Sequence, residues 1–264
     1  MRRQLYILVA VGVILLIGLT LLLTQKKPTL RVPQGYLIKE ADISLTKGDL
    51  IGARALLKQA LEETEDLKTL ENLKSKIEDL NIRILFSPLI EVCSTEYVVK
   101  PKDSIVKIAK EFGTTVELIK RANSLETDII RPQQRLKVNS CVFSLVIDKS
   151  QNRLFLKQKD NVIKTYSVST GKDNSTPTGK FKIVNKLKNP AWFKAGAVVP
   201  PDSPDNILGA RWMGLDVEGY GIHGNRDVNE IGRQVTQGCI RMINQDAEEL
   251  YSIVPIGTEV IIVD

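Results

Sequence analysis

The chain has 264 residues, enough for one large or two to three small domains, and its 43% hydrophobic and 26% charged residues are ordinary for a globular protein. The net charge of +6 is uneven, because residues 1–34 carry five basic and no acidic side chains, whereas residues 142–264 carry fifteen basic and fourteen acidic ones. A nucleic-acid-binding domain needs basic charge clustered on one face. The balance therefore argues against a nucleic-acid partner for the C-terminal half.

Residues 1–27 predict a transmembrane anchor. After Met1-Arg2-Arg3, the stretch 5–24 carries no charge, and a helix of this length spans the roughly 30 Å of a bilayer core at about 1.5 Å per residue. A removed secretory signal is the alternative, but its apolar stretch is usually about 7–15 residues long and ends in a small-residue cleavage site, which the sequence lacks. Basic residues flank both ends, so charge does not fix the orientation.

The cysteine count bears on the compartment. If Cys93 and Cys141 pair, the third cysteine, Cys239, is left as a free thiol. A disulfide would place the body of the protein outside the cytoplasm, and two unpaired, half-buried cysteines are the alternative. We expect a single-pass protein of the cytoplasmic membrane with extracytoplasmic C-terminal domains.

Residues 35–83 predict a small helical spacer. Apolar residues recur at helical spacing from Ala53 to Leu61 and again from Leu67 to Leu80, and Lys47-Gly48-Asp49 is a turn signal. The segment resembles one helical hairpin of the tetratricopeptide type, although such arrays usually need three or more repeats to bury their faces. We interpret it as a stalk or spacer that carries no chemistry.

Residues 95–139 predict a strand–helix–helix–strand unit, with Asp103 capping the first helix. The segments YVVKPKDSIVKIAKEFGTTVELIKRAN and IIRPQQRLKV resemble a LysM domain, a family that binds the N-acetylglucosamine-containing glycan of peptidoglycan or chitin. This resemblance makes Asp103, Ser104 and Asn123 candidate glycan-binding residues. Lys102 and Gln133 stand where the family commonly has glycine, a change that bears on the conformation of both loops.

The LysM resemblance also favours the disulfide. The two terminal strands of such a unit should pair and bring together the residues just outside them. Cys93 and Cys141 occupy those positions, within plausible bridging distance.

Residues 142–264 predict a β-rich domain. Phe143, Leu145 and Ile147 alternate with less apolar neighbours, as in a half-buried strand. Further strands are expected at 154–156, 162–168, 181–184 and 258–263. Asn244 to Ile253 reads as a helix with Asn244 or Asp246 as its cap. We expect a mainly antiparallel β-sandwich or β-barrel, and for the whole chain a multidomain fold: transmembrane helix, helical spacer, α+β LysM unit (βααβ) and β domain.

The stretch YGIHGNRDVNEIGRQVTQGCIRM contains the candidate chemistry. The only histidine, His223, lies sixteen positions before Cys239, and an imidazole with a thiol is the minimum for thiol nucleophilic catalysis. Gly224 and Gly238 adjoin them and permit close approach of backbone to substrate. One histidine and three widely separated cysteines give no metal-ligand spacing, so we expect neither a metal nor a cofactor.

Four segments of this domain resemble an L,D-transpeptidase catalytic domain of the YkuD type: STPTGKF, RWMGL, IHG and GCIRM. Members of this family exchange peptide bonds in bacterial peptidoglycan. A cysteine attacks the L-to-D peptide bond at the third residue of a tetrapeptide stem and expels the terminal D-alanine. The acyl group then passes to an amine of another stem, giving a cross-link, or to another acceptor.

The resemblance implies roles for the motif residues. Cys239 is the expected nucleophile and His223 the base that returns the proton to the leaving amine. The backbone carbonyl of Gly224 is expected to orient the imidazole in place of the usual carboxylate. Backbone N–H groups at Gly238 and Cys239 are the natural oxyanion donors, and Arg241 is a candidate for holding a substrate carboxylate.

One motif departs from the family pattern, which commonly reads Ser-His-Gly-Cys where this chain has Thr236-Gln237-Gly238-Cys239. Thr236 keeps the hydroxyl, whereas Gln237 keeps hydrogen bonding but carries no titrating proton. We therefore expect activity to survive and donor or acceptor preference to be open to change.

Three functions are compatible with these motifs. The first is a membrane-anchored L,D-transpeptidase held on peptidoglycan by its LysM unit. The second is an L,D-carboxypeptidase that passes the acyl group to water, and the third is a non-catalytic wall-binding tether. Water and amine would enter the same acyl-enzyme, so the sequence does not separate the first two. It does not indicate the oligomeric state.

Overall fold

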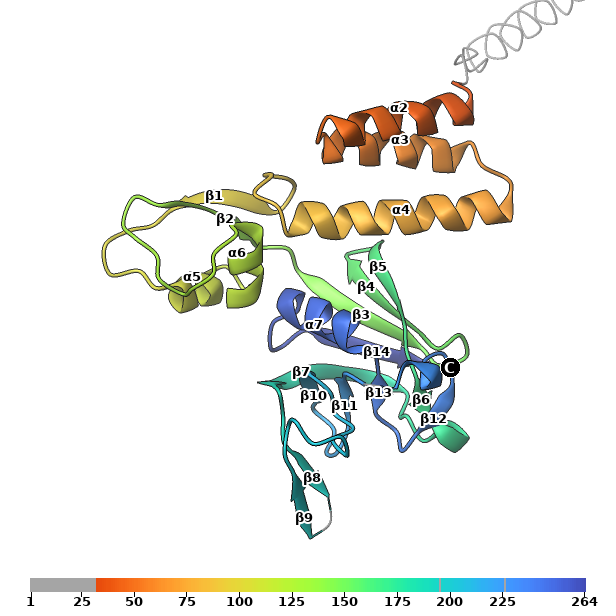
Figure 1. The fold of residues 1–264 in the computed structure, drawn as a ribbon, viewed down its shortest axis with the longest axis vertical. Coiled ribbons are helices and arrows are strands. Elements are labelled where there is room, and N and C mark those ends of the chain that lie inside the picture. The colour runs from red at the N-terminus through yellow and green to blue at the C-terminus, as the bar shows by residue number, and fades with distance from the viewer. Residues whose placement is uncertain (1–31, 195, 226) are drawn as a thin grey trace, which may run out of the picture.

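In the computed structural model, residues 32–194, 196–225 and 227–264 are described (Figure 1). The helices are α2 (Gln34–Thr46), α3 (Leu50–Glu62), α4 (Leu67–Leu85), α5 (Ile105–Glu111), α6 (Val116–Ala122) and α7 (Asn244–Ile253), with short 3-10 turns η1 (Lys172–Asn174) and η2 (Val228–Glu230). The strands are β1 (Ser94–Val98), β2 (Arg135–Asn139), β3 (Phe143–Asp148), β4 (Arg153–Gln158), β5 (Asn161–Ser167), β6 (Thr170–Gly171), β7 (Gly179–Lys188), β8 (Trp192–Lys194), β9 (Ala197–Val199), β10 (Arg211–Leu215), β11 (Gly221–His223), β12 (Gln234–Thr236), β13 (Ile240–Arg241) and β14 (Glu259–Val263).

The predicted anchor, residues 1–27, lies outside the described residues. Within residues 32–264, leaving out 195 and 226, no helix is both long enough and apolar enough to cross a bilayer.

The helical segment folds around a core of its own. Helices α2 and α3 form a hairpin through the predicted turn, in which Gly48 has a φ of 78° and Asp49 caps α3 by accepting the Gly52 N–H at 2.8 Å. Helix α4 supplies the third wall of that core, which holds Leu37, Ala41, Ala53, Leu57, Ala60, Leu73, Ile77 and Leu80. A single hairpin can bury its apolar face here because a third helix covers it.

Helix α4 also packs against the edge strand β5 of the β domain. Glu78 accepts the Thr165 N–H at 3.1 Å and the Thr165 hydroxyl at 2.7 Å, and Asn81 donates to the Ile163 carbonyl at 3.0 Å. These side chains pair with backbone groups that an edge strand otherwise exposes. The helical segment thereby covers one end of the sheet.

The βααβ unit forms as predicted, with β1 antiparallel to β2 and both helices on a small apolar core. The cap of α5 differs from the prediction. Ser104 accepts the Lys107 N–H at 3.3 Å, whereas Asp103 accepts the Lys100 N–H and the Tyr97 hydroxyl, both at 2.8 Å. Asp103 therefore closes the preceding turn, because it lies one residue too early to reach the first free N–H groups of the helix.

The ends of β1 and β2 are linked covalently. Ser94 pairs with Asn139, and just outside this pair Cys93 and Cys141 form a disulfide with their Cα atoms 5.1 Å apart. Cys239 is left as the free cysteine of the chain.

The βααβ unit is attached to the helix α7 of the β domain. Thr115 caps α6 by accepting the Leu118 N–H, and its hydroxyl donates to the Ser252 carbonyl at the end of α7. Glu117 forms an ion pair of 2.7 Å with Lys188 of β7. The two units therefore share one polar contact at the C-terminal end of α7, where unpaired helix carbonyls need donors, and one on β7.

The β domain is built on one eight-stranded sheet with the order β13-β11-β10-β7-β14-β3-β4-β5. Most neighbours are antiparallel, but β14–β3 and β11–β13 are parallel. The chain beyond β5 returns to the opposite edge, where Ser169 bridges Arg241 of β13. The domain is therefore a single curled sheet, whose accumulated twist brings its two edges together, and two packed sheets, as in a sandwich, are not formed by the eight strands.

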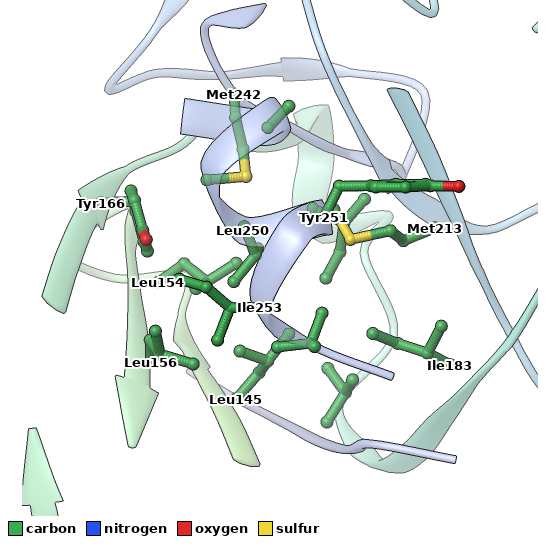
Figure 2. Packing of buried hydrophobic residues seen from close by; sticks show 14 of the residues in the cluster. Leu145, Leu154, Leu156, Tyr166, Ile183, Met213, Met242, Leu250, Tyr251 and Ile253 are labelled. Atoms are coloured by element: carbon green, nitrogen blue, oxygen red, sulfur yellow. The ribbon is translucent and has the colours of Figure 1, made fainter. Parts of the chain in front are cut away.

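Helix α7 fills the concave side of this sheet (Figure 2). Its buried residues Leu250 and Ile253 pack among Leu145, Leu154 and Leu156 of β3 and β4. Each such side chain contributes roughly 1.5–3 kcal/mol when removed from water. The predicted caps of α7 are wrong: Ile243 is the N-cap residue and no side chain caps this helix.

Candidate active site

Two short strands bring the predicted catalytic residues together. In the parallel pair β11–β13, His223 lies opposite Arg241, and Cys239 immediately precedes β13. His223, Cys239 and Arg241 line one cleft of about 790 Å³, with Thr236 and Gln237 on the same wall. Residues sixteen positions apart thus meet because their strands are neighbours.

The imidazole of His223 is held in one orientation. The ring is 1% exposed, lies nearly parallel to Trp212 with centroids 5.9 Å apart, and its Nδ1 is 2.7 Å from the Gly224 carbonyl. A carbonyl oxygen can only accept, so Nδ1 carries the proton and Nε2 keeps its lone pair. Burial, assisted by the charge of Arg241, lowers the pKa of His223 to about 4. The ring is therefore a neutral base near neutral pH.

Glycine is required where the backbone orients this ring. A Cβ on Gly224 would lie 2.1 Å from Asn244 Oδ1, and one on Gly209 would lie 2.2 Å from the same atom. Asn244 also accepts the Ala210 N–H at 3.0 Å. Asn244, which the sequence predicts as a helix cap, therefore packs its side chain against Gly209 and Gly224 and holds the backbone next to the Gly224 carbonyl. Local sequence does not reveal this role.

The thiol of Cys239 is half-buried and donates weakly to the Gly219 carbonyl at 3.5 Å. Burial raises the pKa of Cys239, and the Gly221 N–H and the charge of Arg241 oppose that increase in part. With the pKa of the thiol raised and that of the imidazole lowered, the cleft at rest holds a neutral thiol and a neutral imidazole. A thiolate forms when a proton moves during attack.

Thr236 and Gly238 shape the turn before the nucleophile. The Thr236 hydroxyl donates to the Cys239 carbonyl at 2.6 Å and accepts the Gly238 N–H at 3.1 Å. Gly238 has a φ of 129°, and a Cβ there would meet the Tyr220 ring at 2.5 Å. Both its backbone conformation and its surroundings therefore require glycine.

The two predicted oxyanion donors, the backbone N–H groups of Gly238 and Cys239, differ in whether they are already hydrogen-bonded. The Gly238 N–H is already bound by Thr236, whereas the Cys239 N–H has no acceptor among the residues that the structure describes. The Cys239 N–H is therefore the donor that is available to a substrate oxygen.

Thr176 supports this turn and was not singled out by sequence reasoning. It is buried, its hydroxyl donates to the Gly238 carbonyl at 2.7 Å, and it accepts the Gly171 N–H at 2.7 Å. Its position inside the STPTGKF segment is the signal that could have identified it.

Arg241 has a partner that the sequence did not predict. Its Nη1 forms an ion pair with Glu230 Oε2, and both residues line the cleft. Gln237 is exposed on the same wall. A substrate carboxylate approaching Arg241 therefore meets a carboxylate that is already present.

The candidate glycan-binding residues all make hydrogen bonds inside the βααβ unit. Asp103 and Ser104 form the turn and cap described above. Asn123 donates to the Ile119 and Lys137 carbonyls at 2.8 Å and accepts the Lys137 N–H at 2.7 Å. Their contact with glycan stays a prediction. Across the described residues, no group of three or more His, Cys, Asp or Glu is placed to hold a metal ion.

Comparisons with known proteins identify both units. Residues 143–262 match the YkuD family model, an L,D-transpeptidase catalytic domain, and residues 97–139 match the LysM domain model.

Individual relatives carry the same family name. The protein YqjB of Bacillus subtilis (strain 168), which is described as an L,D-transpeptidase, is 40% identical to this chain. The match covers 46% of this chain and 70% of YqjB. The protein YkuD of Bacillus licheniformis, also described as an L,D-transpeptidase, is 35% identical, and the match covers 62% of this chain and 96% of YkuD. The solved L,D-transpeptidase 3 of Mycobacterium tuberculosis with a faropenem-derived adduct aligns with half of this chain and 65% of its own, at 19% identity and a TM-score of 0.41.

Proposed function

Because the chain belongs to the L,D-transpeptidase family, we propose that it forms cross-links between peptidoglycan stem peptides through an acyl-enzyme on Cys239. The observation that carries this proposal is the pairing of a free thiol with a buried, neutral imidazole in one cleft, the imidazole held by the Gly224 carbonyl at 2.7 Å. That arrangement leaves Nε2 as the base.

In the first step, Cys239 Sγ attacks the carbonyl carbon of the third stem residue while His223 Nε2 takes the thiol proton. The negative charge on the carbonyl oxygen is stabilised by the Cys239 N–H. The C–N bond to the terminal D-alanine then breaks, and His223 returns its proton to the leaving amine. A thioester remains on Cys239.

In the second step, an acceptor amine attacks the thioester and forms a new C–N bond. The C–S bond breaks, the amine loses a proton to His223, and Cys239 regains a proton as the thiol. The low pKa of His223 suits this step, because the imidazole stays unprotonated until the amine supplies its proton. Water attacking the same thioester would make the protein a carboxypeptidase.

We further propose that the LysM unit holds the enzyme on the glycan strands and that residues 1–27 anchor it in the membrane, with the folded units outside the cytoplasm. The Cys93–Cys141 disulfide supports an oxidising compartment. The contacts of Thr115 and Glu117 with the β domain support a fixed attachment of the LysM unit to the catalytic domain.

The test uses the full chain, a disaccharide-tetrapeptide and mass spectrometry of the products, with Cys239→Ala as the matched control. A dimer that lacks one D-alanine supports cross-linking, and a tripeptide without dimer indicates the carboxypeptidase. If wild type and Cys239→Ala both leave the substrate unchanged, the protein is a wall-binding tether and the proposal is wrong.

A further inference from the structure

One peptide group in the turn before β13 carries the free oxyanion donor. The Cys239 N–H and the Gly238 carbonyl belong to this planar unit, which is trans like every other peptide bond of the described chain. In a trans peptide group the N–H and the C=O point in opposite directions. A contact that fixes the Gly238 carbonyl therefore also fixes the direction of the Cys239 N–H.

The hydroxyl of the buried Thr176 makes that contact. It donates to the Gly238 carbonyl at 2.7 Å and accepts the Gly171 N–H at 2.7 Å. A carbonyl oxygen only accepts and an N–H only donates, so the hydroxyl hydrogen has a single direction. Within the described ranges no second donor reaches the Gly238 carbonyl. One hydrogen bond therefore sets the tilt of this peptide group.

A second threonine holds the other polar backbone groups of Gly238 and Cys239. The Thr236 hydroxyl accepts the Gly238 N–H at 3.1 Å and donates to the Cys239 carbonyl at 2.6 Å, which leaves only the Cys239 N–H without a partner in the described part of the chain. A hydrogen bond to the carbonyl of a peptide group polarises that group and makes its N–H a stronger donor. Thr176 therefore affects both the direction and the donor strength of the free N–H.

A buried ammonium group holds the backbone of Thr176. The Lys149 side chain is 4% exposed, and its Nζ donates to the Thr176 carbonyl at 3.0 Å and to Asn174 Oδ1 at 2.6 Å and forms an ion pair of 2.8 Å with Asp264. These three acceptors match the three hydrogens of the ammonium. Asn174 has a φ of 61°, a left-handed conformation that surrounding contacts must support. Lys149 therefore fixes the segment that presents the Thr176 hydroxyl.

The backbone around Thr176 also lies directly against the catalytic turn. A Cβ on Gly171 would lie 2.3 Å from Ser175 Oγ and 2.5 Å from Thr176 N, and one on Gly238 would lie 3.1 Å from the Ser175 carbonyl oxygen. Contacts this close leave no room for added atoms between the two segments. The position of Thr176 and that of the Gly238 carbonyl therefore constrain each other.

We propose that Thr176 is a positioning residue for the acyl transfer, because its hydroxyl acts through the Gly238 carbonyl to aim and polarise the Cys239 N–H. This inference rests on the proposed function and adds to it a residue that does not line the cleft. A negative oxygen forms when the thiol attacks the stem carbonyl and again when the acceptor amine attacks the thioester, so both steps use the same N–H.

The experiment removes the hydroxyl and keeps the shape of the side chain. Thr176→Val loses both hydrogen bonds, whereas Thr176→Ser keeps the hydroxyl. The matched control is Thr115→Val, because Thr115 is also buried, accepts the Leu118 N–H at 2.9 Å and donates to the Ser252 carbonyl. Both valine variants therefore lose one donor and one acceptor, and only Thr176 lies behind the catalytic turn.

Two reactions are measured with the full chain. The first gives kcat and KM for D-alanine release from the disaccharide-tetrapeptide, and the second is the rate at which iodoacetamide alkylates the thiol. In alkylation the thiolate sulfur displaces iodide from a saturated carbon, and no carbonyl oxygen gains charge. Alkylation therefore reports an intact Cys239 without the oxyanion donor, because Cys93 and Cys141 are joined in a disulfide.

Loss of a whole oxyanion donor lowers kcat by about 10²–10³. In Thr176→Val, where the donor is still present, kcat should fall by about tenfold or more and KM should change by less than about threefold, while alkylation stays within about twofold of wild type. Thr176→Ser and Thr115→Val should keep kcat and the alkylation rate within about threefold of wild type.

A kcat of Thr176→Val within about threefold of wild type overturns the inference. An equal fall in kcat and in alkylation also overturns it, since Thr176 would then only support the structure. If Thr176→Val does not fold, Thr176→Ala is judged by the same two rates. If wild type is alkylated but releases no D-alanine, the proposed function is wrong and the inference falls with it.

Discussion

Lowering the pH from about 7 to about 4.5 should destabilise the β domain through the burial of His223. The pKa of this imidazole is about 4 in the folded protein, against its ordinary value of 6.5. Between about pH 4 and pH 6.5, His223 therefore binds a proton in the unfolded chain but stays neutral in the folded chain. The stability that neutral His223 contributes is present above about pH 6.5 and is lost as the pH falls towards 4.

The magnitude follows from the size of the shift. At about 1.36 kcal/mol per unit, the loss reaches roughly 2.5 kcal/mol at pH 4.5 and about 3 kcal/mol below pH 4. Asp246 acts in the opposite direction, because burial raises its pKa to about 6 and protonation on acidification favours the folded state. The pH dependence of wild type alone is therefore not a measure of His223.

A comparison with His223→Gln isolates the imidazole, since Asp246 titrates in both proteins. The glutamine amide keeps a donor for the Gly224 carbonyl but has no pKa in this range. Urea unfolding at both pH values is followed by the fluorescence of Trp192 and Trp212, the two tryptophans of the chain, which both lie in the β domain.

We expect the free energy of unfolding of wild type to fall by about 2.5 kcal/mol more than that of the variant. The same reasoning places the acidic limb of kcat/KM near pH 4, well below the ordinary imidazole pKa. If the two proteins lose the same stability within about 0.5 kcal/mol, the burial argument is refuted.

Three further changes test other parts of the structure. Lys102 and Gln133 have φ values of 71° and 70°, a conformation that costs a side chain about 1–2 kcal/mol. Replacing each by glycine should therefore raise the melting temperature. A lower melting temperature in either variant would refute the argument that these backbone positions are strained. Glu78→Ala should lower the free energy of unfolding by about 1–2 kcal/mol, because it leaves edge-strand donors of β5 unpaired; the exposed Glu71 on the same helix is the control and should change it little. A thiol assay on unfolded, unreduced protein should detect the single free thiol of Cys239, and three thiols would refute the disulfide.

The left-handed backbone at Lys102 and Gln133 illustrates what a family resemblance can and cannot predict. The resemblance marked both positions as ones where glycine is common, and the loops keep the conformation that glycine favours. The sequence could not predict this, because a non-glycine residue enters the left-handed region only when surrounding contacts outweigh its local cost.

The sequence by itself determined the elements and the chemical groups of this protein. Alternation from Phe143 to Ile147 indicates a strand and the spacing from Ala53 to Leu61 a helix, because period two and period 3.6 follow from backbone geometry alone. The His223 and Cys239 motifs likewise carry their chemistry in residue type and local spacing.

Only the tertiary structure decided which distant segments meet. It placed α4 on the edge of β5, curled one sheet around α7 until Ser169 reached Arg241, and set Glu230 against that arginine. None of these contacts has a local signature, because strand order and edge coverage depend on how the whole apolar surface is buried. Residue identity therefore supplied the reactive groups, His223 and Cys239. Tertiary packing placed the Glu230–Arg241 ion pair in the same cleft.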